Sequence, residues 1–296
     1  MRHSQARRQA RYERAFRLGT GLNAGFVAVE FVYGSLVDSL ALLADAGHNL
    51  SDVAGLVIAW GAFAVAERRP SPHFTYGLRK ATILAALLGA ILLLVALGAI
   101  GWEAIHRIGA PRAPDGTTII VVAGIGVAIN TATAWLFFAD RRDDLNIAGA
   151  YLHMAADAAV SLGVVVSGIA IAWTGWSWLD PATSLVIVLV VLVSTWGLLR
   201  DSTRLSLDAA PKDVDLAAVE SWLRSHPGIN GVHDLHVWAL STTQTALTVH
   251  LVASEPHRID PRAVAADLRE RFAIHHSTIQ LEPDGGQHRC AAAPDR

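Results

Sequence analysis

Long apolar runs dominate the first two thirds of the chain. A helix that crosses a membrane needs about 20 mostly apolar residues. Four runs without Asp, Glu, Lys or Arg reach about that length, and they occupy 81–102, 116–139, 158–179 and 181–199. Two further apolar segments, at about 17–37 and 39–66, contain acidic residues. The pattern predicts six transmembrane helices, the fifth of which we extend back to about residue 146.

The pattern of polar and apolar residues changes from about residue 201. Charged residues become frequent, and no apolar run approaches the length of a membrane span. The periodicity predicts helices over 213–226 and 261–273 and strands over 232–240, 245–253 and 277–282. The order αββαβ is typical of a small α+β domain with helices on one face of a sheet.

These patterns predict a multi-domain membrane protein, a six-helix transmembrane bundle followed by a cytosolic α+β domain. We expect a basic cytosolic segment over 1–16, the transmembrane domain over 17–208, and the α+β domain over 209–283. The tail over 284–296, which contains Gly, Ala and Pro, is expected to be disordered.

Composition supports the membrane assignment. Of 296 residues, 52% are hydrophobic and only 17% are charged, and the mean hydropathy is +0.37. These values argue against a wholly soluble, disordered or fibrous chain. The net charge of −2 gives no sign of nucleic-acid binding. A single cysteine excludes an internal disulfide framework, so the 13 histidines are the residues with the capacity to bind metal.

The Lys/Arg bias of the loops predicts the orientation in the membrane. The first 17 residues contain six arginines, and the loops after the second and fourth spans are also basic. The connections at 37–39 and 174–180 have no Lys or Arg. Both termini are therefore expected in the cytoplasm, and the short loops favour the inner membrane of a bacterium.

Ionisable residues recur inside two of the predicted spans. The second span contains His48 and Asp52, and the fifth contains His153 and Asp157. Both pairs have the spacing His-x-x-x-Asp, which puts the two side chains on one face of a helix. If the two helices face each other, the four groups can surround a tetrahedral Zn²⁺, and the two carboxylates offset its charge. Two alternatives are separate hydrogen-bonded pairs that join the helices, and a proton relay without metal.

Several stretches resemble the cation diffusion facilitator family, specifically its zinc-transporting branch. They are Ser39-Leu-Ala-Leu-Leu-Ala-Asp45-Ala-Gly-His48-Asn-Leu-Ser-Asp52, Asn146-Ile-Ala-Gly-Ala-Tyr-Leu-His153-Met-Ala-Ala-Asp157, His233-Asp-Leu-His236-Val-Trp238 and Asp180-Pro181. The resemblance implies a homodimeric metal/proton antiporter with a metallochaperone-like cytosolic domain. It also implies that His48, Asp52, His153 and Asp157 are the ligands of the transported ion. Histidine at the first of these positions resembles the zinc-preferring pattern.

Other polar residues have a functional and a structural interpretation. Asp45 lies three residues before His48. Its functional interpretation is a group on the ion pathway or one that supports the metal ligands from behind. Its structural interpretation is an acid that stabilises the helix. For Glu30 in the first span we favour a polar contact within the bundle, and a role in the vestibule of the ion pathway is the alternative. His73, in the loop 67–80, is a weak metal candidate because neighbouring residues depart from the family pattern. By resemblance, Lys80 is expected to pair with Asp208.

The cytosolic domain carries a second candidate set. By resemblance to family members with cytosolic metal sites, His233, His250, His275 and Glu282 match a zinc-binding set, which would let zinc regulate transport. The alternative is that they are solvated strand histidines. His236 follows His233 by three residues, so in a regular strand the two are expected to point to opposite faces.

The chemistry of these groups favours a secondary transporter over an enzyme. Histidine must be neutral to bind metal, so a site in a dry bundle holds either zinc or protons, and an inward proton gradient can drive zinc out of the cytoplasm. Cadmium and cobalt are further candidate cargoes. An intramembrane metalloprotease would need a string such as His-Glu-x-x-His, which the chain lacks. A membrane protein that senses or binds metal without moving it is the remaining alternative.

Overall fold

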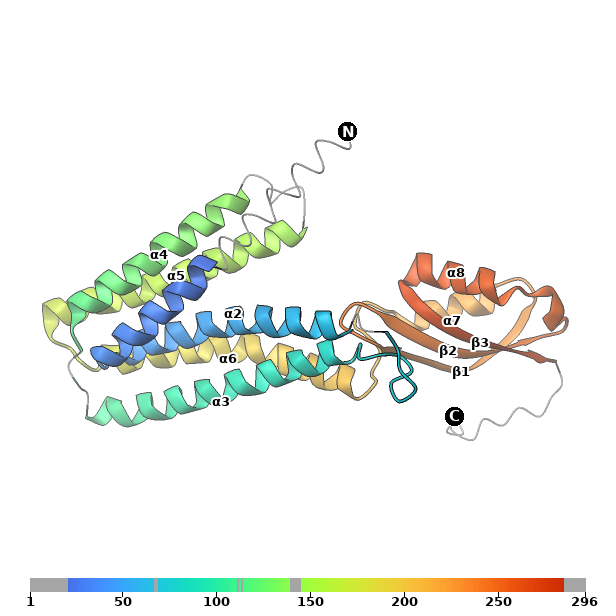
Figure 1. Cartoon of the computed structure of the whole chain (residues 1–296), viewed down its shortest axis with the longest axis horizontal. Coiled ribbons are helices and arrows are strands. Elements are labelled where there is room, and N and C mark those ends of the chain that lie inside the picture. The colour runs from blue at the N-terminus through green and yellow to red at the C-terminus, as the bar shows by residue number, and fades with distance from the viewer. Residues whose placement is uncertain (1–20, 67–68, 111, 113, 139–144, 285–296) are drawn as a thin grey trace. The chain divides into compact units, whose positions relative to one another are not determined.

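The protein is described by a computed structural model over residues 21–66, 69–110, 112, 114–138 and 145–284 (Figure 1). At 52, 55, 56, 59, 60, 63, 137 and 145–150 the backbone is described but the side chain is not. The first helix is described over 21–36. Five more long helices follow: α2 (Leu40–Ala66), α3 (Ala81–Gly109), α4 (Gly116–Phe138), α5 (Leu145–Thr174) and α6 (Leu179–Ser206).

These six helices correspond to the six predicted spans. Four of them, α3 to α6, are long and apolar enough to cross a membrane over their described residues. The first helix and α2 carry the acidic residues that interrupt their apolar sequence. The extension of the fifth span to about residue 146 agrees with α5, which begins at Leu145.

The described chain divides into two compact units. One comprises the described residues up to Val57 together with Gly89–Gly197, and the other comprises Ile58–Leu88 together with the residues from Leu198 onward. The helices α2, α3 and α6 therefore each contribute to both units. The first unit contains the intramembrane candidates, and the second contains the cytosolic ones.

Small residues allow close helix packing in the first unit. A Cβ atom added at Gly116 on α4 would lie 2.7 Å from the carbonyl oxygen of Gly168 on α5. A Cβ atom at Gly126 would lie 2.6 Å from the ring of Phe26 on the first helix and 3.2 Å from Ser161 Oγ on α5. Such contacts are typical of helices in lipid, where van der Waals packing replaces hydrophobic association. They hold α5 against α4 and the first helix.

A buried carboxylate fixes the start of α2. Asp180, at the start of α6, accepts hydrogen bonds from the backbone N–H of Leu40 at 2.7 Å and of Ala41 at 3.3 Å. It also accepts one from the hydroxyl of Ser39 at 2.5 Å. The first N–H groups of a helix have no intrahelical partner, and an anion at that end is favoured by the helix dipole. Asp180 thus anchors the helix that carries His48.

The C-terminal part of the second unit has the predicted αββαβ order. The elements are α7 (Leu216–Ser225), β1 (Ile229–Ala239), β2 (Thr245–Ala253), the short 3₁₀ helix η1 (Pro256–Arg258), α8 (Pro261–Phe272) and β3 (Ile274–Pro283). The sheet order is β1-β2-β3, with β1 antiparallel and β3 parallel to β2. The predicted fold class is confirmed.

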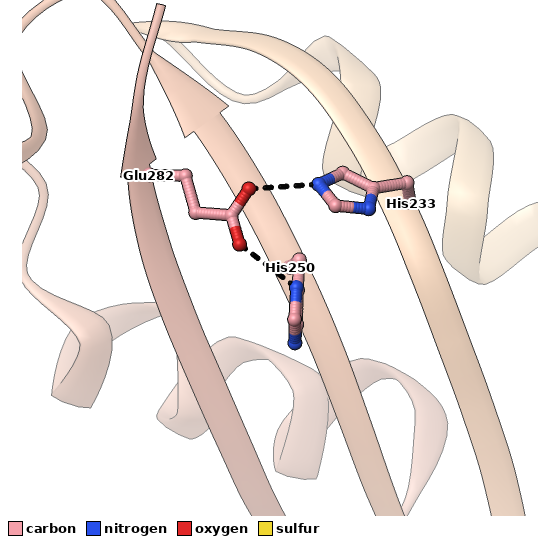
Figure 2. A group of neighbouring side chains, drawn as sticks. All are labelled: His233, His250 and Glu282. Carbon is pink, nitrogen blue, oxygen red and sulfur yellow. Dashed lines mark hydrogen bonds and ion pairs between the residues drawn. The ribbon is translucent and has the colours of Figure 1, made fainter. Parts of the chain in front are cut away.

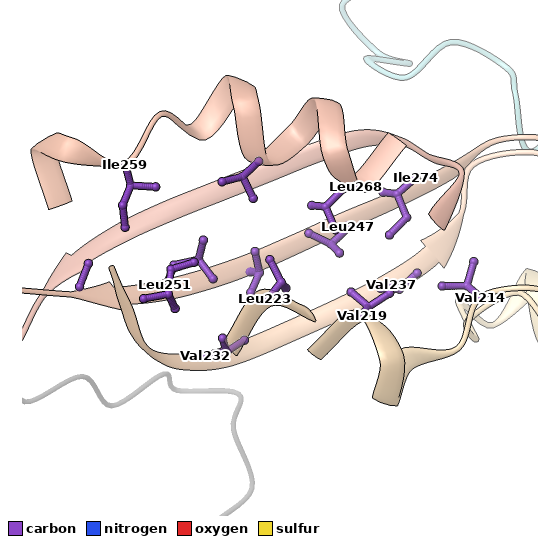
Figure 3. Close-up of a cluster of buried hydrophobic side chains, with 14 residues drawn as sticks. Val214, Val219, Leu223, Val232, Val237, Leu247, Leu251, Ile259, Leu268 and Ile274 are labelled. Atoms are coloured by element: carbon purple, nitrogen blue, oxygen red, sulfur yellow. The ribbon is translucent and has the colours of Figure 1, made fainter. Parts of the chain in front are cut away.

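The core of this domain lies between the two helices and one face of the sheet (Figure 3). Val219 and Leu223 of α7 and Leu268 of α8 contact the strands through residues such as Leu247 and Leu251, and all five are fully buried. Because both helices cover the same face, the other face of the sheet is left for polar side chains. Three of the cytosolic candidates, His233, His250 and Glu282, lie on that face.

Candidate metal-binding sites

Three of the four predicted intramembrane ligands lie together where α2 faces α5. His48 Nε2 is 3.2 Å from Asp157 Oδ1, and His153 Nε2 is 3.7 Å from Asp157 Oδ2. The two imidazole rings meet edge to face, with their centroids 6.5 Å apart. One carboxylate therefore stands between two imidazoles that come from different helices.

The side chains of Asp157, His48 and His153 differ in how far they are exposed to solvent. The Asp157 side chain is 3% exposed, that of His48 is 15% exposed, and that of His153 is 44% exposed. A buried carboxylate with two histidines nearby is a costly arrangement in an apolar bundle unless it binds a cation or a proton. The chemistry of the group, two nitrogens and a carboxylate, suits Zn²⁺.

The fourth predicted ligand is Asp52. It lies in α2, one turn after His48, so the backbone puts it on the same helical face. Its side chain lies outside the part of the chain that the structure describes.

Two other acidic residues, Glu30 and Asp45, are brought together inside the same unit. Both are fully buried. The Asn49 amide donates to Glu30 Oε2 at 3.2 Å and lies 3.5 Å from Asp45 Oδ1, and the Ser161 hydroxyl donates to Asp45 Oδ2 at 2.9 Å. Sequence reasoning treated Glu30 and Asp45 separately and did not single out Asn49, although the spacing of Asp45 and Asn49 is the same i, i+4 pattern.

A second candidate group lies on the open face of the cytosolic sheet (Figure 2). His233 of β1, His250 of β2 and Glu282 of β3 offer ligand atoms that all lie within 4.8 Å of one another. Each carboxylate oxygen of Glu282 contacts one histidine, Oε2 at 2.9 Å from His233 Nε2 and Oε1 at 2.9 Å from His250 Nδ1. Three adjacent strands therefore contribute two nitrogens and a carboxylate that can bind Zn²⁺.

The structure does not bring His275 to this group within one chain. His275 lies at the start of β3 and Glu282 near its end, and seven residues of extended strand at about 3.3 Å each span roughly 23 Å. The predicted set of four is therefore a set of three within one chain. Gln280, which sequence reasoning missed, donates to Glu282 Oε1 at 2.8 Å. Alternate residues of a strand share a face, so the two-residue spacing of Gln280 and Glu282 was the signal in the sequence that could have identified Gln280.

The expectation that His233 and His236 point to opposite faces is wrong. His233 pairs with His250 and His236 pairs with Thr248. An advance of three residues along β1 therefore matches an advance of two residues along β2. Asp234 supplies the extra residue of this bulge, with φ at 51°. His250 and Thr248 share a face, so their partners do as well. His236 Nε2 contacts Asp234 Oδ1 at 3.0 Å rather than Glu282.

The two remaining candidates lie in or beside the loop before α3. His73 is exposed, and it is not part of any group of three or more potential metal ligands among the described residues. Lys80 Nζ lies 2.6 Å from Asp208 Oδ1, which confirms the expected pair. Since both side chains are largely exposed, the pair contributes at most about 1 kcal/mol to stability.

Comparison with known families gives matches to both parts of the chain. Residues 17–205 match the cation efflux transmembrane domain, and residues 211–284 match the cytoplasmic domain of cation efflux proteins. The chain is 38% identical over 285 residues to the metal cation efflux system protein CzcD of Cupriavidus metallidurans, covering 93% of this chain and 90% of that protein.

Other relatives cover a similar share. The zinc transporter ZitB of Escherichia coli is 38% identical over 266 residues, covering 88% of this chain and 85% of that protein. The cadmium, cobalt and zinc/H⁺-K⁺ antiporter of Bacillus subtilis is 35% identical over 272 residues, covering 89% and 87%. Among solved structures, the metal-bound C-terminal domain of the Cupriavidus metallidurans CzcD transporter is 40% identical, covers 23% of this chain and 99% of that chain, and has a TM-score of 0.22.

Proposed function

The chain belongs to the cation diffusion facilitator, or cation efflux, family, and from that premise we propose that it exports zinc from the cytoplasm in exchange for protons. It is a multi-pass membrane protein and a transporter of metal cations rather than an enzyme. The names of its relatives include zinc, cadmium and cobalt. We propose zinc as the principal cargo, with cadmium and cobalt as further cargoes, and a bacterial inner membrane with both termini in the cytoplasm.

The observation that carries this proposal is the convergence of His48 and His153 on the buried Asp157. We propose that these three side chains, with Asp52, hold the transported ion. Two imidazoles and two carboxylates give a tetrahedral set with no formal charge when Zn²⁺ is bound. A neutral complex is the form that an apolar bundle accommodates at least cost.

Proton coupling follows from competition for the same atoms. A histidine nitrogen that binds zinc cannot hold a proton, and carboxylates bind metal in their ionised form. The site therefore holds zinc or protons, and if it opens alternately to the two sides of the membrane, protons entering from outside drive zinc outwards. An inward proton gradient then supplies the driving force.

The test is zinc flux into proteoliposomes that hold the full-length protein and a zinc indicator, under an imposed pH gradient. We expect flux that follows the gradient, and its loss in His48→Gln. His106→Gln is the matched control, because His106 is an exposed histidine of α3 that contacts Trp102 O. Zinc binding without any gradient-driven flux in the wild-type protein would favour the alternative of a metal-binding protein that does not transport.

We also propose a cytosolic zinc site at His233, His250 and Glu282, formed by the geometry of the three strands. Zinc there neutralises a buried carboxylate and links all strands of the sheet. We propose that the chain works as a homodimer, for which its cytoplasmic-domain match is the support. Filling the site when cytosolic zinc rises would then stiffen this domain and raise transport.

Zinc binding to the full-length protein tests the cytosolic site separately. Glu282→Gln is expected to remove one class of zinc sites in a calorimetric titration while gradient-driven flux at high zinc persists. His226→Gln is the control, because His226 is a histidine of the same domain that follows α7, where its Nδ1 lies 3.2 Å from Pro227 O. An unchanged number of zinc sites in Glu282→Gln would remove the cytosolic proposal and leave the transport proposal intact.

A further inference from the structure

Two carboxyl groups meet inside the membrane bundle, and the described helices around them carry no lysine or arginine. Glu30 of the first helix and Asp45 of α2 are both 0% exposed, and the amide nitrogen of Asn49 lies 3.2 Å from Glu30 Oε2 and 3.5 Å from Asp45 Oδ1. The first helix over 21–36, the whole of α2, α4 and α5 contain no Lys or Arg at any described position. Among the side chains that the structure describes, the titratable groups that face the pair are His48 on α2 and Asp157 on α5.

The hydrogen-bond donors around the pair are too few for two ionised carboxylates. Asn49 contributes its amide and Ser161 its hydroxyl, and Glu30 Oε1 is buried with no amide or hydroxyl donor in reach among the described residues. An ionised carboxylate only accepts hydrogen bonds, so two ionised carboxylates here would share one amide and one hydroxyl, whereas a proton on one of the pair supplies the missing donor. Two like charges this close in a dry site cannot both ionise, which is the situation of paired carboxyl groups that share one proton.

This pair lies next to the proposed transport site along two helices. Asp45 is three residues before His48 on α2, and Ser161, which donates to Asp45, is four residues after Asp157 on α5. One helical turn separates the two groups on each side. A charge at the transport site therefore acts on the pair through an apolar medium that screens it weakly.

We propose that Glu30 and Asp45 share one proton while the transport site is free of metal, and that binding of Zn²⁺ expels this proton. The inference rests on the proposed function. Without metal, the Asp157 carboxylate favours a proton on the pair, whereas a bound divalent cation one turn away favours its loss. The pair is thus a second proton-binding site of the exchange, separate from the metal ligands.

Proton release on zinc binding tests the proposal. The full-length protein in detergent, in weak buffer with a pH indicator, is titrated with Zn²⁺, and protons released per zinc bound are counted. We expect Glu30→Gln to bind zinc but to release about one proton fewer per zinc than the wild type, because its amide carries no exchangeable charge. Asp45→Asn should show the same deficit, since the two residues share a single proton.

Glu103→Gln is the matched control. Glu103 is also an acid of a membrane helix, but its partner is the guanidinium of Arg107, whose Nε donates to it at 2.8 Å. Its substitution should leave the proton count unchanged. A Glu30→Gln count equal to that of the wild type overturns the inference. A deficit that instead depends on added Na⁺ or K⁺ would show a metal cation at the pair, and also overturns it.

A spectroscopic measurement on the wild-type protein tests the inference even if the variants do not fold. In the infrared difference spectrum of the wild-type protein, zinc addition should remove a carbonyl band of a protonated carboxylic acid, and a band that persists contradicts the inference. The two proposals fail differently. A wild-type protein that exchanges zinc for protons with normal counts in Glu30→Gln refutes the pair alone, whereas a wild-type protein without exchange refutes the transport proposal.

Discussion

Replacing Asp157 by Asn is the sharpest test of the intramembrane site. Asn has nearly the same volume and keeps an oxygen ligand, so the change removes a charge without leaving a cavity. The side chain is 3% exposed and lies 3.2 Å from His48 Nε2. Removing one partner of a buried set of charges costs about 3–5 kcal/mol, and about 1.4 kcal/mol is a factor of ten in affinity. Zinc affinity should therefore fall by roughly two to three and a half orders of magnitude.

The assay is the initial rate of zinc entry into proteoliposomes under a fixed pH gradient, measured over a wide range of zinc concentrations. Asp157→Asn should raise the zinc concentration for half-maximal flux by about 100-fold or more. His153→Gln should have a smaller effect, because its side chain is 44% exposed and lies 3.7 Å from Asp157. Glu103→Gln, the same kind of charge removal on α3, should leave flux unchanged.

The unfolding temperature of each variant in detergent separates a local from a global effect. The reasoning is refuted if well-folded Asp157→Asn protein reaches half-maximal flux within about threefold of the wild-type zinc concentration, since that corresponds to less than about 1 kcal/mol. It is also refuted if His153→Gln impairs zinc affinity much more than Asp157→Asn does. In that case the buried carboxylate would not be the centre of the site.

Three further substitutions test the fold. Asp180→Ala removes the acceptor of the first N–H groups of α2 and should lower the free energy of unfolding by at least about 1 kcal/mol. The loss should appear as a lower unfolding temperature in detergent, and an unchanged temperature would contradict the capping role. Leu251→Ala in the fully buried cytosolic core should cost about 2–5 kcal/mol in urea unfolding followed by circular dichroism, and a loss below about 1 kcal/mol would show that the cavity closes. Burial acts to raise the pKa of Asp38, but hydrogen bonds from Arg112 and Arg107 outweigh it and lower that pKa below its ordinary value of 3.8. Its stabilising effect should be present above about pH 4 and be lost progressively as the pH falls through the lowered pKa. Asp38→Asn should therefore destabilise more at neutral pH than at pH 3, and equal destabilisation at both would refute this.

Much of the fold was predictable because hydrophobic burial imposes its own period on the sequence. The long apolar runs indicated the membrane helices α3 to α6, although α5 ends at Thr174 and not at the end of the run 158–179. The alternation over 245–253 coincides with β2 (Thr245–Ala253). Element ends were less certain: β3 begins at Ile274 rather than at 277, because pairing with β2 extends it over residues with little alternation.

The candidate sites were predictable where spacing alone brings residues together. Residues four apart on a helix share a face, so the spacing of His153 and Asp157 is enough to link them. The neighbourhood of Glu30 and Asp45 depends on how the first helix packs against α2, which no local pattern encodes. Likewise, the bulge at Asp234 reverses the direction of His236, and a regular strand period predicts the wrong face for it.

The membrane helices, the αββαβ order and the acid–histidine spacings can all be read from the amino-acid sequence, because each depends on residues that are near one another in the chain. The folded arrangement was needed to learn which helix faces which, that Asp157 stands between two imidazoles, and that Glu282 joins His233 and His250 while His275 does not. These contacts join residues that are mostly tens to more than a hundred positions apart. They are set by the packing of whole elements, which the periodicity of a single segment does not specify.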